Sequence, residues 1–281
     1  MVKFLRSFCL AGLLFLMCAQ AFALVEEKQG GLKTHERLWV TSFLNYPPFG
    51  QINKYGDGID TAFQPLLDLI KSEAKIGIEY AVQDTYSKRM FGVVNGDIDL
   101  VLGAYYDSEE YLGMDMIYPS LLNNPLVVVT MPYKSLNIKT RDDLKNLKGA
   151  MDSRERLADY VSKDLKNYQI EKFDTSEKLY EQLFVGNVDY ILTSRYYGAL
   201  EQAKLGIRDM VLMSKQALWD MPLFIGVSKV TVKSDYITKT IKKVLKPHQE
   251  EIKSAIEQRV IEEIRRADEA SDGVVPPSFV K

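Results

Sequence analysis

Two short stretches of the chain repeat one pattern, and this repeat constrains the fold more than any other feature. Residues 96–102 read GDIDLVL, and residues 186–192 read GNVDYIL. Each stretch follows a segment with apolar residues at helical spacing, residues 86–94 and 176–185. A glycine commonly ends a helix, and an unbroken apolar run is typical of a buried parallel strand. The repeat therefore predicts two α/β lobes of like construction, with a cleft between them that suits a small ligand.

The first 23 residues have the pattern of a secretory signal peptide. Lys3 and Arg6 supply the basic region, residues 10–17 are apolar, and Ala21-Phe22-Ala23 is typical of a cleavage site. The apolar run is too short to span a membrane. No later run reaches that length, so we expect a secreted protein that is not inserted in the membrane after cleavage.

Composition argues against several classes of function. Both cysteines, Cys9 and Cys18, lie in the predicted signal, which excludes disulfides, thiol catalysis and cysteine-bound metals from the mature chain. The two histidines, His35 and His248, are far apart in sequence, which argues against a histidine metal site or a Ser-His-Asp triad. The formal net charge of −2 does not suggest nucleic-acid binding. We expect no metal, no cofactor and no nucleic-acid partner.

Strand and helix patterns alternate along the mature chain, which calls for parallel sheets covered by helices. Strands are expected at residues 37–43, 76–80, 126–130, 170–173, 210–213 and 223–227. Helices are expected at residues 60–74, 86–94, 142–147, 153–166, 176–185, 196–205, 234–245 and 249–267. The second repeat lies between two strongly apolar strands. The simplest topology therefore inserts a second lobe, 125–221, into a first lobe made of 24–124 and 222–281, and the two crossings form a two-strand hinge.

In order and spacing, these segments resemble the bacterial periplasmic solute-binding proteins of the polar amino-acid class, family 3. The resemblance is carried by Tyr46-Pro47-Pro48-Phe49, Gly58-Ile59-Asp60, both repeats, residues 115–119, and the segments DLKNLKG at 143–149 and LFIGVSK at 223–229. It implies a type II two-lobed α/β fold, with parallel-rich sheets flanked by helices. It also implies a monomer in the periplasm that delivers a small-molecule ligand to an ABC importer permease or a receptor.

The chain departs from this family at the residues that clamp an amino acid. Typical members hold the ligand carboxylate with an Arg where this chain has Tyr111, and the ammonium with an Asp where it has Ser194. Residues 152–156, DSRER, replace an anion-binding turn. A bidentate Arg is the strongest simple contact for a carboxylate. Its loss together with the Asp argues against a standard α-amino acid as ligand.

Aromatic rings and arginines remain to line the cleft. Rings stack on flat groups or hold cations, and Arg154 at a predicted helix start and Arg195 at a strand end favour an anion. The candidate ligand-binding residues are Tyr46, Tyr86, Tyr105, Tyr106, Tyr111, Arg154, Ser194, Arg195 and Trp219. The alternative for each ring is core packing. The alternative for the arginines, Arg156 included, is surface pairing with Asp152, Glu155 or Asp159.

The leading hypothesis is a non-enzymatic binding protein for a small polar or aromatic organic solute. Two alternatives stay open. One is an enzyme on the same fold, since cyclohexadienyl dehydratases share this architecture. The other is a module that has lost its small ligand and serves a protein partner. Asp99 and Asp189, at the entry to the repeated strands, are expected to be structural.

Overall fold

The computed structural model describes residues 37–271, except residues 84, 107–112 and 135. The predicted signal peptide lies outside the described residues. So do Tyr111 and the side chain of Tyr86.

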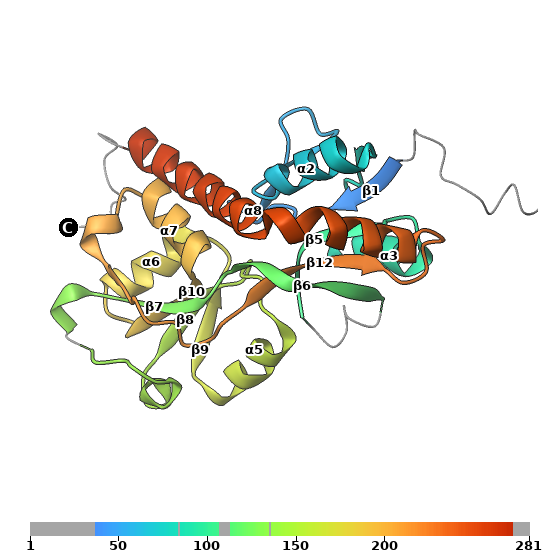
Figure 1. The fold of residues 1–281 in the computed structure, drawn as a ribbon. Helices are drawn as coiled ribbons and strands as arrows, with labels where there is room; N and C mark the ends of the chain where they lie inside the picture. The colour runs from blue at the N-terminus through green and yellow to red at the C-terminus, as the bar shows by residue number, and fades with distance from the viewer. Residues whose placement is uncertain (1–36, 84, 107–112, 135, 272–281) are drawn as a thin grey trace, which may run out of the picture.

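The two repeated stretches end in the central strands of two sheets (Figure 1). These strands are β5 (Leu100–Tyr105) and β10 (Tyr190–Ser194), and each has a parallel neighbour on one side and an antiparallel neighbour on the other. The first sheet contains, in spatial order, β4 (Gly77–Tyr80), β1 (Arg37–Thr41), β5, β12 (Pro222–Ser228) and β6 (Met114–Asn123). The second contains β11 (Leu212–Met213), β7 (Leu126–Thr130), β10, β8 (Gly149–Asp152) and β9 (Ile170–Phe173). The predicted α/β fold with two lobes is confirmed.

Helices flank both sheets. The first lobe carries α2 (Gln64–Ala74), α3 (Tyr86–Asn95) and a small hairpin of β2 (Gly50–Ile52) and β3 (Ile59–Thr61). The second lobe carries α5 (Asp159–Asp164), α6 (Ser176–Phe184) and α7 (Arg195–Lys204). Short 3-10 turns lie at Pro132–Lys134, Arg141–Leu144, Leu165–Asn167 and Arg208–Met210.

The repeat has the same structural role in both lobes. Gly96, at φ +80°, caps α3, and Gly186, at φ +79°, follows α6. Asp99 Oδ2 accepts the backbone N–H of Trp39 at 2.9 Å, and Asp189 Oδ2 accepts that of Lys148 at 2.9 Å. Each carboxylate thus fixes the parallel strand beside it. The structural role expected for both aspartates is confirmed by these contacts.

Two adjacent segments connect the lobes. The chain leaves the first sheet after Asn123 and returns to it at Pro222. The outgoing and returning segments are joined by backbone bonds from Leu126 N to the Trp219 carbonyl at 2.8 Å and from Asn124 N to the Met221 carbonyl at 3.0 Å. This pairing has the form of the two-strand hinge that the sequence predicts.

The last helix, α8 (Ser234–Ser271), reaches across both lobes (Figure 1). Beyond its midpoint it packs on α7, where Tyr196 Oη donates to Glu257 at 2.8 Å, and Arg208 pairs with Asp268 at 2.7 Å. Across the described residues no helix, α8 included, combines the length and the apolar character needed to span a membrane.

Several parts of the fold differ from the sequence prediction, among them the helix expected at residues 142–147, which is a 3-10 turn, and the following three. The helix predicted to begin at Ser153 begins at Asp159, because the Asp152 carboxylate accepts the backbone N–H of Arg154 at 2.8 Å and closes a turn after β8. Arg154 is therefore not in the first turn of a helix. The two predicted C-terminal helices are one, and α8 continues through Pro247 because apolar residues on both sides of it are buried. Strand β6 was not predicted.

Candidate ligand-binding cleft

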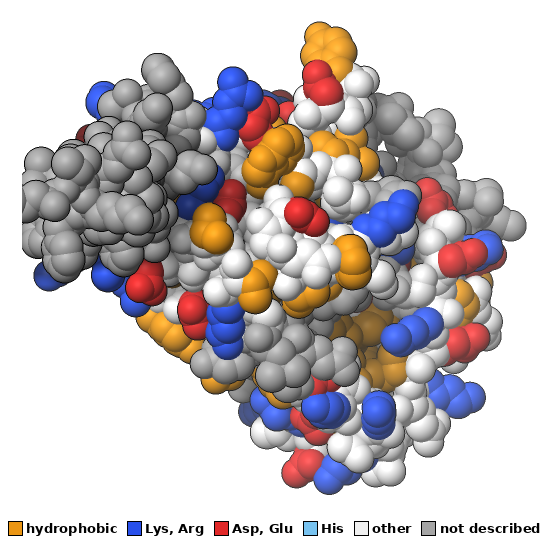
Figure 2. All heavy atoms as spheres, turned by 90° about the vertical axis from the view of Figure 1, so that its right-hand side faces the viewer, with side chains coloured by type: hydrophobic (Ala, Val, Ile, Leu, Met, Phe, Trp, Pro, Cys, Tyr) orange, Lys and Arg blue, Asp and Glu red, His pale blue; other side chains and the backbone are white. Residues whose placement is uncertain are grey.

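A cavity of about 250 Å³ lies between the lobes. In the first lobe its walls are formed by the end of β1, by α3 and by β5. In the second lobe they are formed by the segment after β8, by α5 and by β9. Most of the lining is apolar and includes Phe43, Met90, Val93, Leu102 and Leu157. Figure 2 shows a recess on the α3 side of the molecule, with a hydrophobic floor and Lys and Arg side chains around it.

The cavity lies where β1 and β5 end. These strands are parallel, so their carboxyl ends meet at one edge of the sheet, the usual ligand-binding edge in open α/β sheets. Gly103 near the end of β5 has φ +78°, and a Cβ there would lie 2.8 Å from Phe63 and 2.9 Å from Phe43. The glycine therefore lets β5 pass against two rings in a conformation that other residues rarely adopt.

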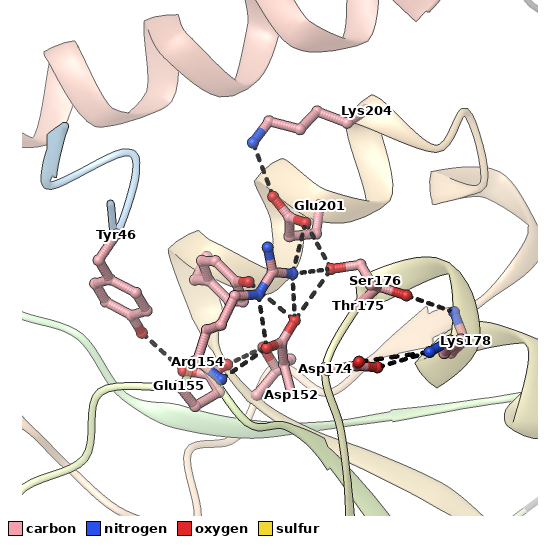
Figure 3. A network of polar contacts seen from close by, with 12 residues as sticks. Tyr46, Asp152, Arg154, Glu155, Asp174, Thr175, Ser176, Lys178, Glu201 and Lys204 are labelled. Carbon is pink, nitrogen blue, oxygen red and sulfur yellow. Dashed lines mark hydrogen bonds and ion pairs between the residues drawn. The ribbon is translucent and has the colours of Figure 1, made fainter. Parts of the chain in front are cut away.

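A buried polar network closes the cleft beside the cavity (Figure 3). Tyr46, in the first lobe, donates its hydroxyl to Glu155 Oε2 at 2.7 Å. The same carboxylate accepts the Ser194 backbone N–H and the Ser194 hydroxyl, both at 2.9 Å, and the Thr193 hydroxyl. We call Tyr46, Glu155, Thr193 and Ser194 the interlobe lock. All four hydrogen bonds end on one side chain of the second lobe.

Aromatic rings reinforce the lock. Tyr46 stacks on Tyr197 of α7, with ring centroids 4.9 Å apart and planes tilted by 17°. Phe49 meets Tyr196 edge-on at 6.0 Å. These contacts cross from the first lobe to the second, so rings of the two lobes pack directly on each other.

Burial sets the protonation of the lock. Burial raises the pKa of the Glu155 carboxyl above its ordinary value, and the hydrogen bonds from Thr193, Tyr46 and Ser194 partly offset the shift. Burial also raises the pKa of the Tyr46 hydroxyl, and the nearby Glu155 charge raises it further. Tyr46 therefore keeps its proton and acts as the donor.

A second network lies behind the lock, around Asp152 at the end of β8 (Figure 3). Its carboxylate accepts the Arg154 guanidinium through two bonds, at 2.9 and 2.6 Å, and the Tyr197 hydroxyl at 3.0 Å. Arg154 also donates to Ser176 at 3.1 Å and lies 3.6 Å from Glu201. Burial alone would raise the pKa of the Asp152 carboxyl, but the bonds from Arg154 outweigh it and hold that pKa below its ordinary value. Arg154 is thus held by protein carboxylates.

Three cations line the cavity itself. Arg89, on α3, is buried and donates to the Ser42 carbonyl at 2.9 Å. Lys172, on β9, is exposed at the rim. Arg156 is partly buried, and within the described chain it makes no hydrogen bond and no ion pair. The cavity is therefore positively charged.

The structure brings some of the candidate residues to the cleft and places others elsewhere. Tyr105 lines the cavity, and Tyr46 and Ser194 belong to the lock. Tyr106 is half-exposed and is not part of the cavity lining. Arg195 donates to the carbonyls of Lys215 and Ser214, at 2.8 and 3.5 Å, outside the cavity.

Trp219 is a core residue beside the hinge. It is 1% exposed, and its indole N–H donates to Asp164 at 2.8 Å. The Arg141 guanidinium lies over its ring at 4.8 Å. Its indole nitrogen is thus satisfied within the second lobe, and it does not line the cavity.

Sequence reasoning did not select Glu155 and Arg156 as binding residues. Both were treated as members of surface ion pairs. The available signal was the run of charged residues at 152–156, at the place where the resemblance implies an anion-binding turn. The turn after β8 decides which charged side chains of residues 152–156 point into the cleft, and the sequence did not predict this turn.

No family model matches this chain, and no curated protein matches it. Solved structures do. A mutant of ArgBP from T. maritima aligns at 17% identity with a TM-score of 0.58, over 79% of this chain and 94% of that one. The GluR0 ligand-binding core in complex with L-glutamate aligns at 13% identity with a TM-score of 0.60, over 82% of this chain and 100% of that one. A histidine kinase sensor domain with similarity to periplasmic binding proteins aligns at 14% identity with a TM-score of 0.59, over 87% of this chain and 99% of that one. At these identities the likeness establishes the fold. The chain therefore has the two-lobed fold of the periplasmic solute-binding proteins.

Proposed function

We propose that this protein captures a small polar or aromatic organic solute between its lobes, for an ABC importer or a receptor. The observation that carries the proposal is the position of the cavity. Both lobes contribute to its walls, at the carboxyl ends of β1 and β5, and its lining combines apolar side chains with polar and charged ones. A binding role is also supported by the similar structures, which include arginine-bound ArgBP, the GluR0 ligand-binding core in complex with L-glutamate and a histidine kinase sensor domain.

The geometry of the lock supports a solute other than a standard α-amino acid. Ser194, where typical members hold the ligand ammonium, is fully buried and bonded to Glu155 and Tyr46. The Glu155 carboxylate faces four donors of the protein. An ammonium group would have to displace these bonds. Secretion to the periplasm, a monomeric state and binding without catalysis are parts of the same proposal.

The lock also favours a second candidate, a module that serves a protein partner. Tyr46 joins the lobes through the Glu155 carboxylate, so the bond lies between two side chains of the protein itself. A chain whose lobes are joined by its own side chains can present a closed surface to a partner.

Thermal unfolding of the secreted, purified protein against a broad metabolite panel tests the proposal. A ligand at 100 times its Kd stabilises the folded state by about 2.7 kcal/mol, which corresponds to a rise in Tm of roughly 5–10 °C for a chain of this size. Mass spectrometry of the denatured protein would reveal a co-purified solute. If no compound raises the Tm and no small molecule is released, the solute-binding proposal fails and the partner-binding candidate takes its place.

A further inference from the structure

We propose that the interlobe cavity selects a small carboxylic acid with an apolar body and no amino group, and that Arg156 binds its carboxylate. This inference rests on the proposed solute-binding function. It names the ligand class from the charges and surfaces of the cavity.

Arg156 differs from Arg154, two residues before it. The Arg154 guanidinium is paired with Asp152 through two bonds, with further contacts to Ser176 and Glu201. Arg156 lines the cavity, is partly buried, and has no hydrogen-bond acceptor in the described part of the chain. A guanidinium presents five N–H donors in a planar fork. Leaving a partly buried cation without a partner is unfavourable, so this site calls for an anion.

The carboxylate of Glu155, beside Arg156 in sequence, forms no ion pair with it in the described structure. Both oxygens of Glu155 accept bonds from Tyr46, Thr193 and Ser194, which leaves the side chain facing the lock. Among the described lining residues the other charged groups are Arg89 and Lys172. The positive charge of the cavity attracts a ligand carboxylate and disfavours an ammonium group on the same ligand.

The size and surface of the cavity define the rest of the ligand. Its volume of about 250 Å³ lies just below the range of roughly 300–1,000 Å³ typical of ligand pockets, which indicates a small molecule. Phe43, Met90, Val93 and Leu157 offer an apolar surface for its body. A planar carboxylate fits the fork of a single Arg. A dianion such as a phosphate ester would lose more hydration on this apolar floor.

Calorimetric titration with a matched set of ligands tests the inference. Hexanoate, hexanamide and L-norleucine share one alkyl chain and differ in the head group, and benzoate offers an aromatic body. We expect hexanoate or benzoate to bind at least tenfold more tightly than hexanamide and L-norleucine. Arg156→Gln should weaken binding of the acid at least tenfold and change that of the amide by less than twofold.

Two variants serve as controls. Arg37→Gln removes the same charge at the opposite end of β1, where Arg37 pairs with Glu79 at 2.6 Å, and should leave the affinity for the acid unchanged. Lys172→Gln should weaken binding by a smaller factor that shrinks further as salt is added, because the lysine is exposed. The melting curve of Arg156→Gln should match that of the parent protein, since Arg156 makes no bond to any of the described residues that the variant would remove.

The outcomes separate this inference from the proposed function. Three results would overturn the inference: equal affinity for the acid and the amide, tighter binding of L-norleucine, or full affinity for the acid in Arg156→Gln. In each case the proposed solute-binding function still stands if any solute binds. A panel ligand of another class, with no response to the acids, would do the same. If neither the acids nor the panel binds, both proposals fall.

Discussion

The interlobe lock predicts that Tyr46→Phe, which removes one oxygen atom, measurably lowers the free energy of unfolding. The substitution keeps the ring that stacks on Tyr197 and deletes the hydroxyl that donates to Glu155 at 2.7 Å. A hydrogen bond to a charged acceptor contributes about 1.5–3 kcal/mol to stability. Glu155 keeps its bonds from Thr193 and Ser194, so the expected loss in the free energy of unfolding lies in that range and not above it.

Tyr80→Phe is the matched control. Its hydroxyl donates to Gln64 at 2.9 Å inside the first lobe, a neutral bond that contributes about 0.5–1.5 kcal/mol. Both variants would be unfolded in urea and followed by circular dichroism, with small-angle scattering of the folded protein. We expect Tyr46→Phe to lose more stability than Tyr80→Phe and, unlike it, to show a larger radius of gyration, because the Tyr46 bond joins the two lobes whereas the Tyr80 bond lies within one.

The scattering result is the sharper test. If Tyr46→Phe costs no more than Tyr80→Phe and its radius of gyration is unchanged, the Tyr46 hydroxyl does not hold the lobes together. The description of this network as an interlobe lock would then be wrong.

Three further predictions follow from the same region. The pKa of the Glu155 carboxyl is raised in the folded state, so the folded protein holds a proton there that the unfolded chain loses above pH 4.5. The stability of the parent protein relative to Glu155→Gln should therefore fall as pH rises above 4.5. A stability difference between the two proteins that stays constant with pH in urea titrations would contradict this. Asp152→Asn should lower stability by about 3 kcal/mol, the low end for a buried pair because the Arg154 left behind is half-exposed, as measured by thermal unfolding, with Arg154→Gln costing more because it leaves the buried Asp152 carboxylate without its cation. Gly103→Ala should lower the free energy of unfolding by about 2–4 kcal/mol, because the backbone is left-handed there and the new Cβ clashes with two rings. Gly186→Ala has nearly the same φ but lies in open space, so it should show the backbone cost alone. Equal losses of stability for the two variants in a denaturant titration would show that the rings move aside.

The local signals in the sequence were strong where the structure depends on local chemistry. Glycines at 96 and 186 end or follow a helix at positive φ, and the apolar runs after them become central strands. Asp99 and Asp189 bond the backbone beside them. Such features depend on backbone conformation and on burial of whole strands, so periodicity and residue type predict them.

The same local reasoning was wrong where a tertiary contact decides between two structures. Ser153 is a good helix-capping residue, but the Asp152 carboxylate bonds the Arg154 backbone and delays the helix to Asp159. Pro247 normally ends a helix, but buried residues on both sides of it keep α8 continuous.

By itself the sequence determined two like α/β lobes and their repeated strands, and it showed Tyr111 and Ser194 where the family that it resembles has charged residues. Only the tertiary structure decided which charged side chains are paired and which line the cavity. Glu155 had charged neighbours in sequence, yet its partners are Tyr46, Thr193 and Ser194. Arg154 is paired, whereas Arg156 faces the cavity without a partner in the described chain. The physical reason is that a charged side chain pairs with whatever the packing of the lobes brings within about 3 Å, and no local pattern encodes that distance.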